Sequence, residues 1–319
     1  MKKQIYWIFF CALIFTGCFT ADHAKQERQV PETTQTKDLS DRKNTPPDTE
    51  TPTETPVKPV SPESNITETD WSDCFGNFNG AAVVYDAADE QYLIYQKELA
   101  DTRRSPCSTF KIISSLIAME NGVFSPDASV RTWSGEIFWN ENWNRDTEFY
   151  QAFRDSCVWY FREVINETGK ELMQKELNRL SYGNCDISDW EGRQNTNNHN
   201  RALTGFWIES SLLISPKEQA EVMERIFGNN STYSRQSLDA LKQAMLVTEQ
   251  NDADFPIYGK TGMGKENGTL VDAWFTGFAE RKDGNLYFCV YLGKTDDKDA
   301  SSADAKEIAL RILLNLSGK

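Results

Sequence analysis

The sequence predicts a mixed α/β fold, in which an antiparallel sheet built from both ends of the folded segment is flanked by helices and interrupted by an inserted all-helical lobe. Three observations predict it: strand-like runs near the start at 81–85 and 92–95, strand patterns that return late in the chain, and helical or irregular segments throughout 123–247. We expect a small-ligand site in the cleft between the two lobes.

The elements follow in order along the chain. The first two strands form a hairpin through the turn at 86–91. The helix that carries Ser108 follows and ends near Asn121-Gly122, a good C-terminal signal. Ser215 and Pro216 are suited to be the N-cap and first residue of a later helix. The helices are predicted at 170–180, 216–227, 235–247 and 303–316, and the late strands at 256–261, 271–280 and 285–293.

The chain begins with an export signal. A basic start and an apolar run over 5–15 predict a signal peptide at 1–17, since the run is too short to span a membrane comfortably. The segment Phe-Thr-Gly-Cys that ends at Cys18 resembles the bacterial lipobox, in which the cysteine is lipidated; the alternative is an ordinary cleaved signal beside a chance cysteine. We expect an exported bacterial protein, lipid-anchored at Cys18 at the outer face of the cell membrane or in the periplasm.

A change of composition marks the domain boundary. Residues 18–69 are rich in Thr, Pro, Glu and Lys and poor in apolar side chains, so we expect a disordered tether. The folded domain is predicted at 70–319, with the α/β lobe at 70–122 and 248–319 and the helical lobe at 123–247.

Composition excludes several classes of function. A formal net charge of −14 argues against binding nucleic acid, which needs a basic surface. The two histidines, His23 and His199, are too few for a His-rich metal site, and the cysteines show no metal-binding cluster, so no metal is expected. Pairing among the five cysteines beyond the leader stays open; they are Cys74, Cys107, Cys157, Cys185 and Cys289.

The pair Ser108 and Lys111 is the candidate catalytic centre. Three residues apart at the start of a helix, they lie over the same helix face, so a nucleophile and a nitrogen base stand side by side. The spacing alone proves little, because Ser40 and Lys43 share it within the predicted tether. The functional interpretation depends on the motifs that accompany Ser108.

Three further motifs follow in a fixed order: Ser156-Cys157-Val158, Tyr182-Gly183-Asn184 and Lys260-Thr261-Gly262. Together with Ser108-x-x-Lys111 they resemble the class D, oxacillinase-type, serine β-lactamases, over roughly 71–319. The resemblance implies a serine β-lactamase and penicillin-binding-protein-like fold. It also implies hydrolysis of the β-lactam amide bond and β-lactam resistance.

The resemblance assigns five catalytic residues. Ser108 forms the acyl-enzyme, and Lys111, neutral in an apolar pocket, takes up carbon dioxide or bicarbonate to form a carbamate that serves as general base. Trp207 donates its indole N–H to the carbamate, Ser156 relays protons, and Val158 keeps the pocket dry. A plain core role is the alternative for Trp207.

The resemblance also assigns the substrate-binding surface. Lys260 and Thr261 bind the substrate carboxylate, and the backbone N–H groups of Ser108 and Met263 form the oxyanion hole. The complete predicted binding set is Tyr182, Asn184, Lys260, Thr261, Gly262 and Met263. Many members place an arginine near the start of the final helix. Here that place holds Ala305. The alternatives are that Lys306 or Lys294 takes the place of the arginine, or that the substrate carboxylate is bound more weakly. The long segment 185–205 borders the site.

Two other functions remain open. The β-lactam sensor domains of penicillin-responsive receptors share these motifs and acylate without turnover, although nothing resembling their membrane helices precedes residue 19 apart from the leader. A small penicillin-binding peptidase is disfavoured by Val158, because such enzymes carry asparagine there. The expected partner is a small-molecule β-lactam, and the expected state is a monomer or weak dimer.

Overall fold

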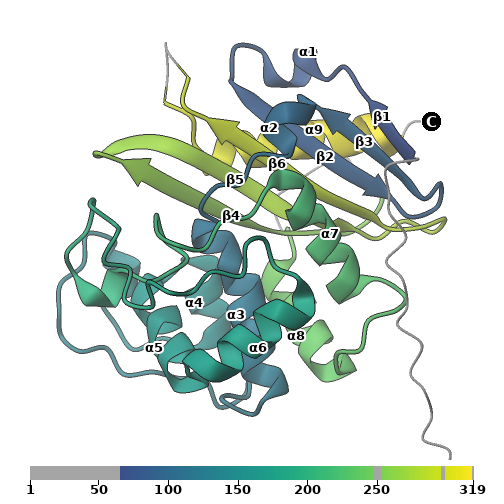
Figure 1. The fold of residues 1–319 in the computed structure, drawn as a ribbon. Helices are drawn as coiled ribbons and strands as arrows, with labels where there is room; N and C mark the ends of the chain where they lie inside the picture. The colour runs from purple at the N-terminus through teal and green to yellow at the C-terminus, as the bar shows by residue number, and fades with distance from the viewer. Residues whose placement is uncertain (1–64, 248–252, 296–298, 318–319) are drawn as a thin grey trace, which may run out of the picture. The chain divides into compact units, whose positions relative to one another are not determined.

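The computed structural model describes residues 65–247, 253–295 and 299–317 (Figure 1). The signal peptide at 1–17, the lipidation at Cys18 and the tether up to residue 64 fall outside the described residues. Among the helices of the described ranges, none combines the length and apolar character that crossing a membrane requires.

A six-stranded sheet joins the two ends of the described chain, as predicted. Its order is β1-β3-β2-β6-β5-β4. The strands are β1 (Ile66–Glu68), β2 (Gly80–Asp86), β3 (Gln91–Tyr95), β4 (Ile257–Glu266), β5 (Thr269–Ala279) and β6 (Leu286–Gly293). The early and late halves meet where β2 pairs antiparallel with β6, with Ala82 opposite Val290. This pairing closes one sheet around the inserted segment.

Strand β1 corrects two predictions. It pairs parallel with β3, so the sheet is mixed rather than wholly antiparallel. It also lies inside 18–69, the segment predicted as tether, so the folded part begins earlier than residue 70. Ile66 is its one apolar residue and packs beside the sheet, while the strand is held mainly by backbone pairing at the sheet edge. Three residues carry too little alternation to predict a strand.

Strand β4 runs five residues beyond its predicted end at 261. It pairs with β5 as far as Glu266, with a register irregularity after Gly264, and the hairpin closes through Asn267 and Gly268, both at positive φ. Glycines along β4 lower its intrinsic strand propensity, which hid its length from the sequence. The long hairpin carries the segment 260–263 into the middle of the molecule (Figure 1).

Each face of the sheet is covered by helices. On one face α1 (Ser72–Phe75) and α9 (Ser302–Ser317) pack through side chains such as Ile308 and Ile312. On the other face lie α2 (Lys97–Ala100) and α7 (Pro216–Phe227), the latter with Ala220 against β2. Helix α7 was predicted within the helical lobe, but it packs on the sheet. Its predicted start is confirmed, since Ser215 caps it in a capping box beside Pro216.

The helical lobe surrounds helix α3 (Lys111–Glu120). Eight of its ten residues are buried, which marks it as the central helix of the lobe. The other helices are α4 (Phe149–Arg154), α5 (Val158–Thr168), α6 (Lys170–Leu180) and α8 (Arg235–Met245), with 3-10 turns η2 (Cys107–Phe110), η3 (Glu141–Trp143) and η4 (Arg201–Leu203). The lobe has a largely aromatic core, and the candidate catalytic lysine begins its central helix.

Candidate active site

Ser108 lies in the 3-10 turn η2, which leads directly into α3. Pro106 precedes the turn, and Thr109 bonds back to the Pro106 carbonyl through both its N–H, at 3.1 Å, and its hydroxyl, at 2.7 Å. Cys107 takes a positive φ of 49°, which is uncommon for a residue with a Cβ. Such backbone strain is typical of functional sites and here holds Ser108 at the head of α3.

The amine of Lys111 lies 2.9 Å from the hydroxyl of Ser108, which confirms that the two share one helix face. Lys111 is 1% exposed, and its Nζ stands 5.4 Å from the centre of the Phe161 ring. Burial lowers the pKa of Lys111 to about 8, so about a tenth of the amine is uncharged at pH 7. A neutral amine beside a hydroxyl can accept its proton.

Trp207 is fully buried beside the serine turn. Its ring stacks on Phe110, with centroids 6.0 Å apart, and its carbonyl accepts hydrogen bonds from the Cys107 N–H and the Ser105 hydroxyl. Its indole Nε1 is buried and has no hydrogen-bond partner among the described residues. An unpaired buried donor is costly, so it marks a place where an acceptor can be taken up.

The turn between α4 and α5 carries Ser156, which has a φ of +55°. The helices on either side place aromatic rings against both site lysines: Phe161 against Lys111 and Phe153 against Lys260, whose Nζ is 5.8 Å from the ring centre. The turn is therefore beside the two lysines. Val158, two residues after Ser156, is half-buried against the aromatic core.

The middle of β4 lies against the serine turn. A Cβ on Gly262 would meet Thr109 Cγ2 at 3.0 Å and the Pro106 carbonyl oxygen at 3.1 Å, so glycine permits this close approach. Lys260 is buried, and its Nζ donates to the Thr261 carbonyl and approaches the Thr261 hydroxyl at 3.2 Å. Burial, with the positive charges of Lys111 and Lys306, lowers the pKa of Lys260.

A cleft of about 490 Å³ opens beside this strand. Its lining includes Lys260 and Thr261 from β4, Arg154 from α4 and Lys306 from α9. Ala305, the residue at the place of the family's arginine, belongs to α9, is fully buried and packs in the core on one face of the sheet. The cationic residue that α9 brings to the cleft is Lys306, and the cleft has the polarity expected for an anionic small molecule.

The model of a protein family described as "penicillin binding protein transpeptidase domain" matches residues 80–314 of this chain. The chain belongs to this family. The probable β-lactamase YbxI of Bacillus subtilis is 30% identical over 249 residues, which cover 78% of this chain and 85% of the relative. β-Lactamase OXA-1 of Escherichia coli is 31% identical over 253 residues, covering 77% and 88%.

The resemblance to class D β-lactamases is confirmed by structure as well. The crystal structure of a class D β-lactamase from Bacillus subtilis superposes with a TM-score of 0.65 at 30% identity, covering 77% of this chain and 95% of that one. The members with similar sequence and structure also include a receptor. The C-terminal domain of the Bacillus licheniformis BlaR penicillin-receptor gives a TM-score of 0.69 at 28% identity, covering 80% and 97%. Regulatory protein BlaR1 is 30% identical, and this chain spans 39% of its length.

Two of the predicted substrate contacts have other roles in this member of the family. Tyr182 is fully buried and packs edge-on against Phe110, so its side chain supports the serine turn from within the core. Asn184 uses its whole amide locally: its oxygen accepts from the Leu213 N–H, and its nitrogen donates to the Ser211 carbonyl at 2.8 Å. Both residues therefore take part in packing and loop structure, and their place in the substrate-binding set stays a prediction.

The cysteines beside the motifs are free, as are the other two in the described ranges. Cys107 and Cys157 are buried, and burial raises the pKa of the thiol of each, for Cys157 to about 11. Cys185 is only partly buried, and its thiol pKa is also raised by burial. A raised pKa keeps a thiol protonated, so these cysteines serve as small apolar side chains rather than as reactive thiols.

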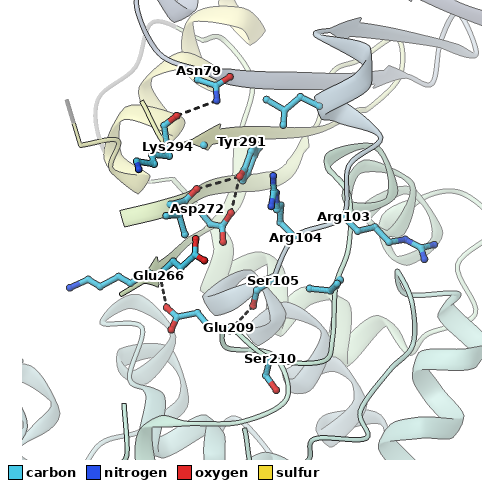
Figure 2. Close-up of a pocket in the computed structure, with 15 residues that line it drawn as sticks. Asn79, Arg103, Arg104, Ser105, Glu209, Ser210, Glu266, Asp272, Tyr291 and Lys294 are labelled. Carbon is cyan, nitrogen blue, oxygen red and sulfur yellow. Dashed lines mark hydrogen bonds between the residues drawn. The ribbon is translucent and has the colours of Figure 1, made fainter. Parts of the chain in front are cut away.

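A second cavity, of about 450 Å³, lies beside the far end of β4, where Lys265 and Glu266 line it (Figure 2). Tyr291 donates to Asp272 at 2.7 Å on its wall, and Arg104 and Lys294 also line it. None of the predicted catalytic side chains lines this cavity. Lys294 therefore belongs to a different surface from Lys306, and of the two candidate substitutes for the arginine only Lys306 lines the cleft with Lys260.

Sequence reasoning missed the residues that hold the site together. Phe153 and Phe161 contact the lysines, and Glu209 ties the Trp207 loop to the serine turn through its N–H, which donates to Ser105 Oγ at 2.8 Å. Glu209 stands two residues after Trp207, to which the resemblance assigns the contact with the carbamate. Its positive φ of 52° gives no signal in the sequence, because glutamate rarely adopts it.

Proposed function

We propose that this chain hydrolyses the amide bond of β-lactams through a covalent acyl-enzyme on Ser108, and so confers β-lactam resistance. The observation that carries the proposal is the 2.9 Å approach of the Lys111 amine to the Ser108 hydroxyl in a water-poor pocket. Class D β-lactamases among its relatives support the reaction type.

The residues divide the reaction between them. The Ser108 oxygen attacks the lactam carbonyl carbon while its proton passes to the side chain of Lys111. The N–H groups of Ser108 and Met263 stabilise the charge on the carbonyl oxygen, and Ser156 delivers a proton to the ring nitrogen as the amide bond breaks. Water then cleaves the ester and restores the serine hydroxyl.

We propose that Lys111 works as a carbamate formed with carbon dioxide. The residues fit that group: burial keeps the amine partly neutral, Val158 and the aromatic core exclude water, and the unpaired indole N–H of Trp207 is the available buried donor. The carbamate supplies an anionic general base in a pocket where no carboxylate of the described residues pairs with Lys111.

The substrate carboxylate is assigned to the cleft beside β4. Lys260 and the Thr261 hydroxyl provide its inner contacts, and Lys306 provides the cationic contact that the family's arginine supplies elsewhere. Arg154 and Lys306 also line this cleft, and their positive charges raise its electrostatic potential, which favours an anion.

Export is part of the same proposal. The leader at 1–17 predicts secretion, and lipidation at Cys18 would anchor the chain at the outer face of the cell membrane, with the acidic domain acting as a monomer or weak dimer. We expect a metabolically labelled lipid precursor to be incorporated into the unmodified chain and not into Cys18→Ala.

A β-lactam sensor is the second candidate. The observation that favours it is the similarity to the BlaR penicillin-receptor domain, at a TM-score of 0.69. A sensor and an enzyme share acylation and differ in the release of the acyl group.

Hydrolysis of a chromogenic cephalosporin by the full chain tests the proposal. We expect multiple turnovers that Ser108→Ala abolishes. Retained turnover in Ser108→Ala would exclude the assigned nucleophile, and a burst of one equivalent without further release would identify the sensor.

A further inference from the structure

Glu209 joins two segments that are far apart in the sequence. Its backbone N–H donates to Ser105 Oγ at 2.8 Å, in the segment that leads into the serine turn. Its carboxylate Oε1 accepts from the backbone N–H of Lys265, at the far end of β4 (Figure 2). One residue therefore spans the gap between the turn and the strand.

These two segments are the ones that carry the oxyanion-hole groups. Ser105 precedes Ser108 by three residues, and Lys265 follows Met263 by two. The strand and the turn also touch directly, where Gly262 meets Thr109 and Pro106 and where Gly264 meets Cys107 Sγ. The bridge through Glu209 adds a hydrogen-bonded link beyond these contacts, next to Gly264 along the strand.

The backbone conformation of Glu209 is the one in which it contacts both the serine-turn segment and β4. Its φ of +52° is rarely adopted by a residue with a Cβ, and its side chain is half-buried. Burial raises the pKa of its carboxyl, and in the described part of the chain it forms no ion pair with lysine or arginine. Its backbone N–H donates to the Ser105 hydroxyl, and its carboxylate accepts from the Lys265 N–H and from one further side chain.

That side chain is Asn197, from the polar segment predicted to border the site. Its Nδ2 donates to Glu209 Oε2 at 2.6 Å and to the Lys265 carbonyl at 2.8 Å, and its Oδ1 accepts from the Gly268 N–H. Asn197 thus links Glu209 Oε2 to the end of the β4–β5 hairpin. The long segment 185–205, which contains Asn197, is therefore part of the link between the serine turn and β4.

We infer that Glu209 is a positioning residue that sets the separation of the Ser108 and Met263 N–H groups, and that Asn197 fixes its carboxylate. The inference rests on the proposed acylation of Ser108. Oxyanion donors act over a narrow range of distance, and a displacement of about 1 Å can cost a factor of about 100 in rate. Loss of the bridge should therefore slow acylation more than it weakens substrate binding.

The test measures single-turnover acylation of the full chain by a fluorescent penicillin over a range of concentrations. In Glu209→Ala we expect the maximal acylation rate to fall about 10- to 100-fold, with the half-saturating concentration changed less than about threefold. The matched control is Glu136→Ala. Glu136 accepts from Asn200 of the same loop, so the control removes a loop contact that does not reach β4.

A pair of conservative changes keeps the test independent of folding. Asn197→Asp sets a second carboxylate against Glu209 and should slow acylation about tenfold or more. Adding Glu209→Gln in that background restores an N–H···O contact between the two side chains, and we expect most of the lost rate to return. A role limited to stability would move the unfolding temperature without this recovery.

The outcomes separate the inference from the proposed function. If the unmodified chain is not acylated, both fail together. If it is acylated and Glu209→Ala acylates within about threefold of it, or the double variant is slower than Asn197→Asp alone, the positioning role is overturned while acylation of Ser108 stands.

Discussion

The amine of Lys111 lies 2.9 Å from the hydroxyl of Ser108, and the groups that face it are the Phe161 ring and the thiols of Cys107 and Cys157 rather than a carboxylate. A buried lysine that is not neutralised by an acid is a base or a reactive amine rather than half of a structural ion pair. This buried amine therefore leads to predictions about stability, pH dependence and the requirement for bicarbonate.

Replacing the buried amine should stabilise the fold. The pKa of Lys111 is lowered to about 8, so keeping its ammonium form buried costs about 3 kcal/mol below that pH. We expect Lys111→Met to abolish acylation and to raise the free energy of unfolding at pH 7 by about 1–3 kcal/mol, measured by denaturant titration in buffer purged of carbon dioxide.

The sign of the pH dependence checks that explanation. Because the folded pKa lies below the unfolded one, the unfolded chain binds more protons between about pH 8 and 10.5, and stability of the unmodified chain rises with pH there. The advantage of Lys111→Met should therefore shrink above pH 8. An advantage that is constant from pH 7 to 10 would contradict the assigned cause.

Trp207 should control the affinity for carbon dioxide. Its buried indole N–H has no partner among the described residues, so Trp207→Phe removes the donor while keeping an aromatic ring in the core. In buffer depleted of bicarbonate we expect turnover to be low in both the unmodified chain and Trp207→Phe. The bicarbonate concentration that restores half of the maximal turnover should be about tenfold or more higher in Trp207→Phe. Equal requirements in the two proteins would remove Trp207 from the carbamate site.

Lys306 should bind the substrate carboxylate. It lines the cleft with Lys260, while Lys294 lines the other cavity and provides a matched control. We expect Lys306→Ala to raise KM about 3- to 10-fold with a smaller change in kcat, since one partly solvated charge contact is worth about 1 kcal/mol. Lys306→Arg should retain binding and Lys294→Ala should leave KM unchanged. The reverse pattern would move the carboxylate to the second cavity.

Gly262 should be intolerant of a methyl group. An added Cβ would lie 3.0 Å from Thr109 Cγ2 and 3.1 Å from the Pro106 oxygen, so β4 must shift by a few tenths of an ångström away from the turn. We expect Gly262→Ala to slow acylation about tenfold or more with an unchanged far-ultraviolet circular dichroism spectrum. The control Gly122→Ala changes a glycine with open space around its Cβ position, and there only a modest loss of stability is expected because of its positive φ.

Local signals in the sequence predicted much of this molecule. The Ser108–Lys111 contact depends on helical spacing alone, and the bounds of α6 and α7 follow from capping residues and periodicity. Strands β2 and β3 were found from their apolar runs to within one residue at each end. The mixed α/β fold with an inserted helical lobe is confirmed by the class D structures.

The features that escaped prediction depend on contacts between distant segments. Strand β1 exists because β3 offers an edge, and α7 lies on the sheet because Ala220 fits against it. Tyr182 is inaccessible because Phe110 covers it, which no spacing could reveal. The positive φ angles at Cys107, Ser156 and Glu209 are imposed by the assembled site against the preference of each residue.

The rate at which the acyl group leaves Ser108 tests the central claim most directly. Intact-mass analysis after mixing with a penicillin, followed over time and mapped to the peptide that contains Ser108, measures formation and loss of the adduct together. The proposed function predicts an adduct on Ser108 that disappears within seconds as free product exceeds one equivalent. An adduct that persists for hours at one equivalent, or one on another residue, would contradict it.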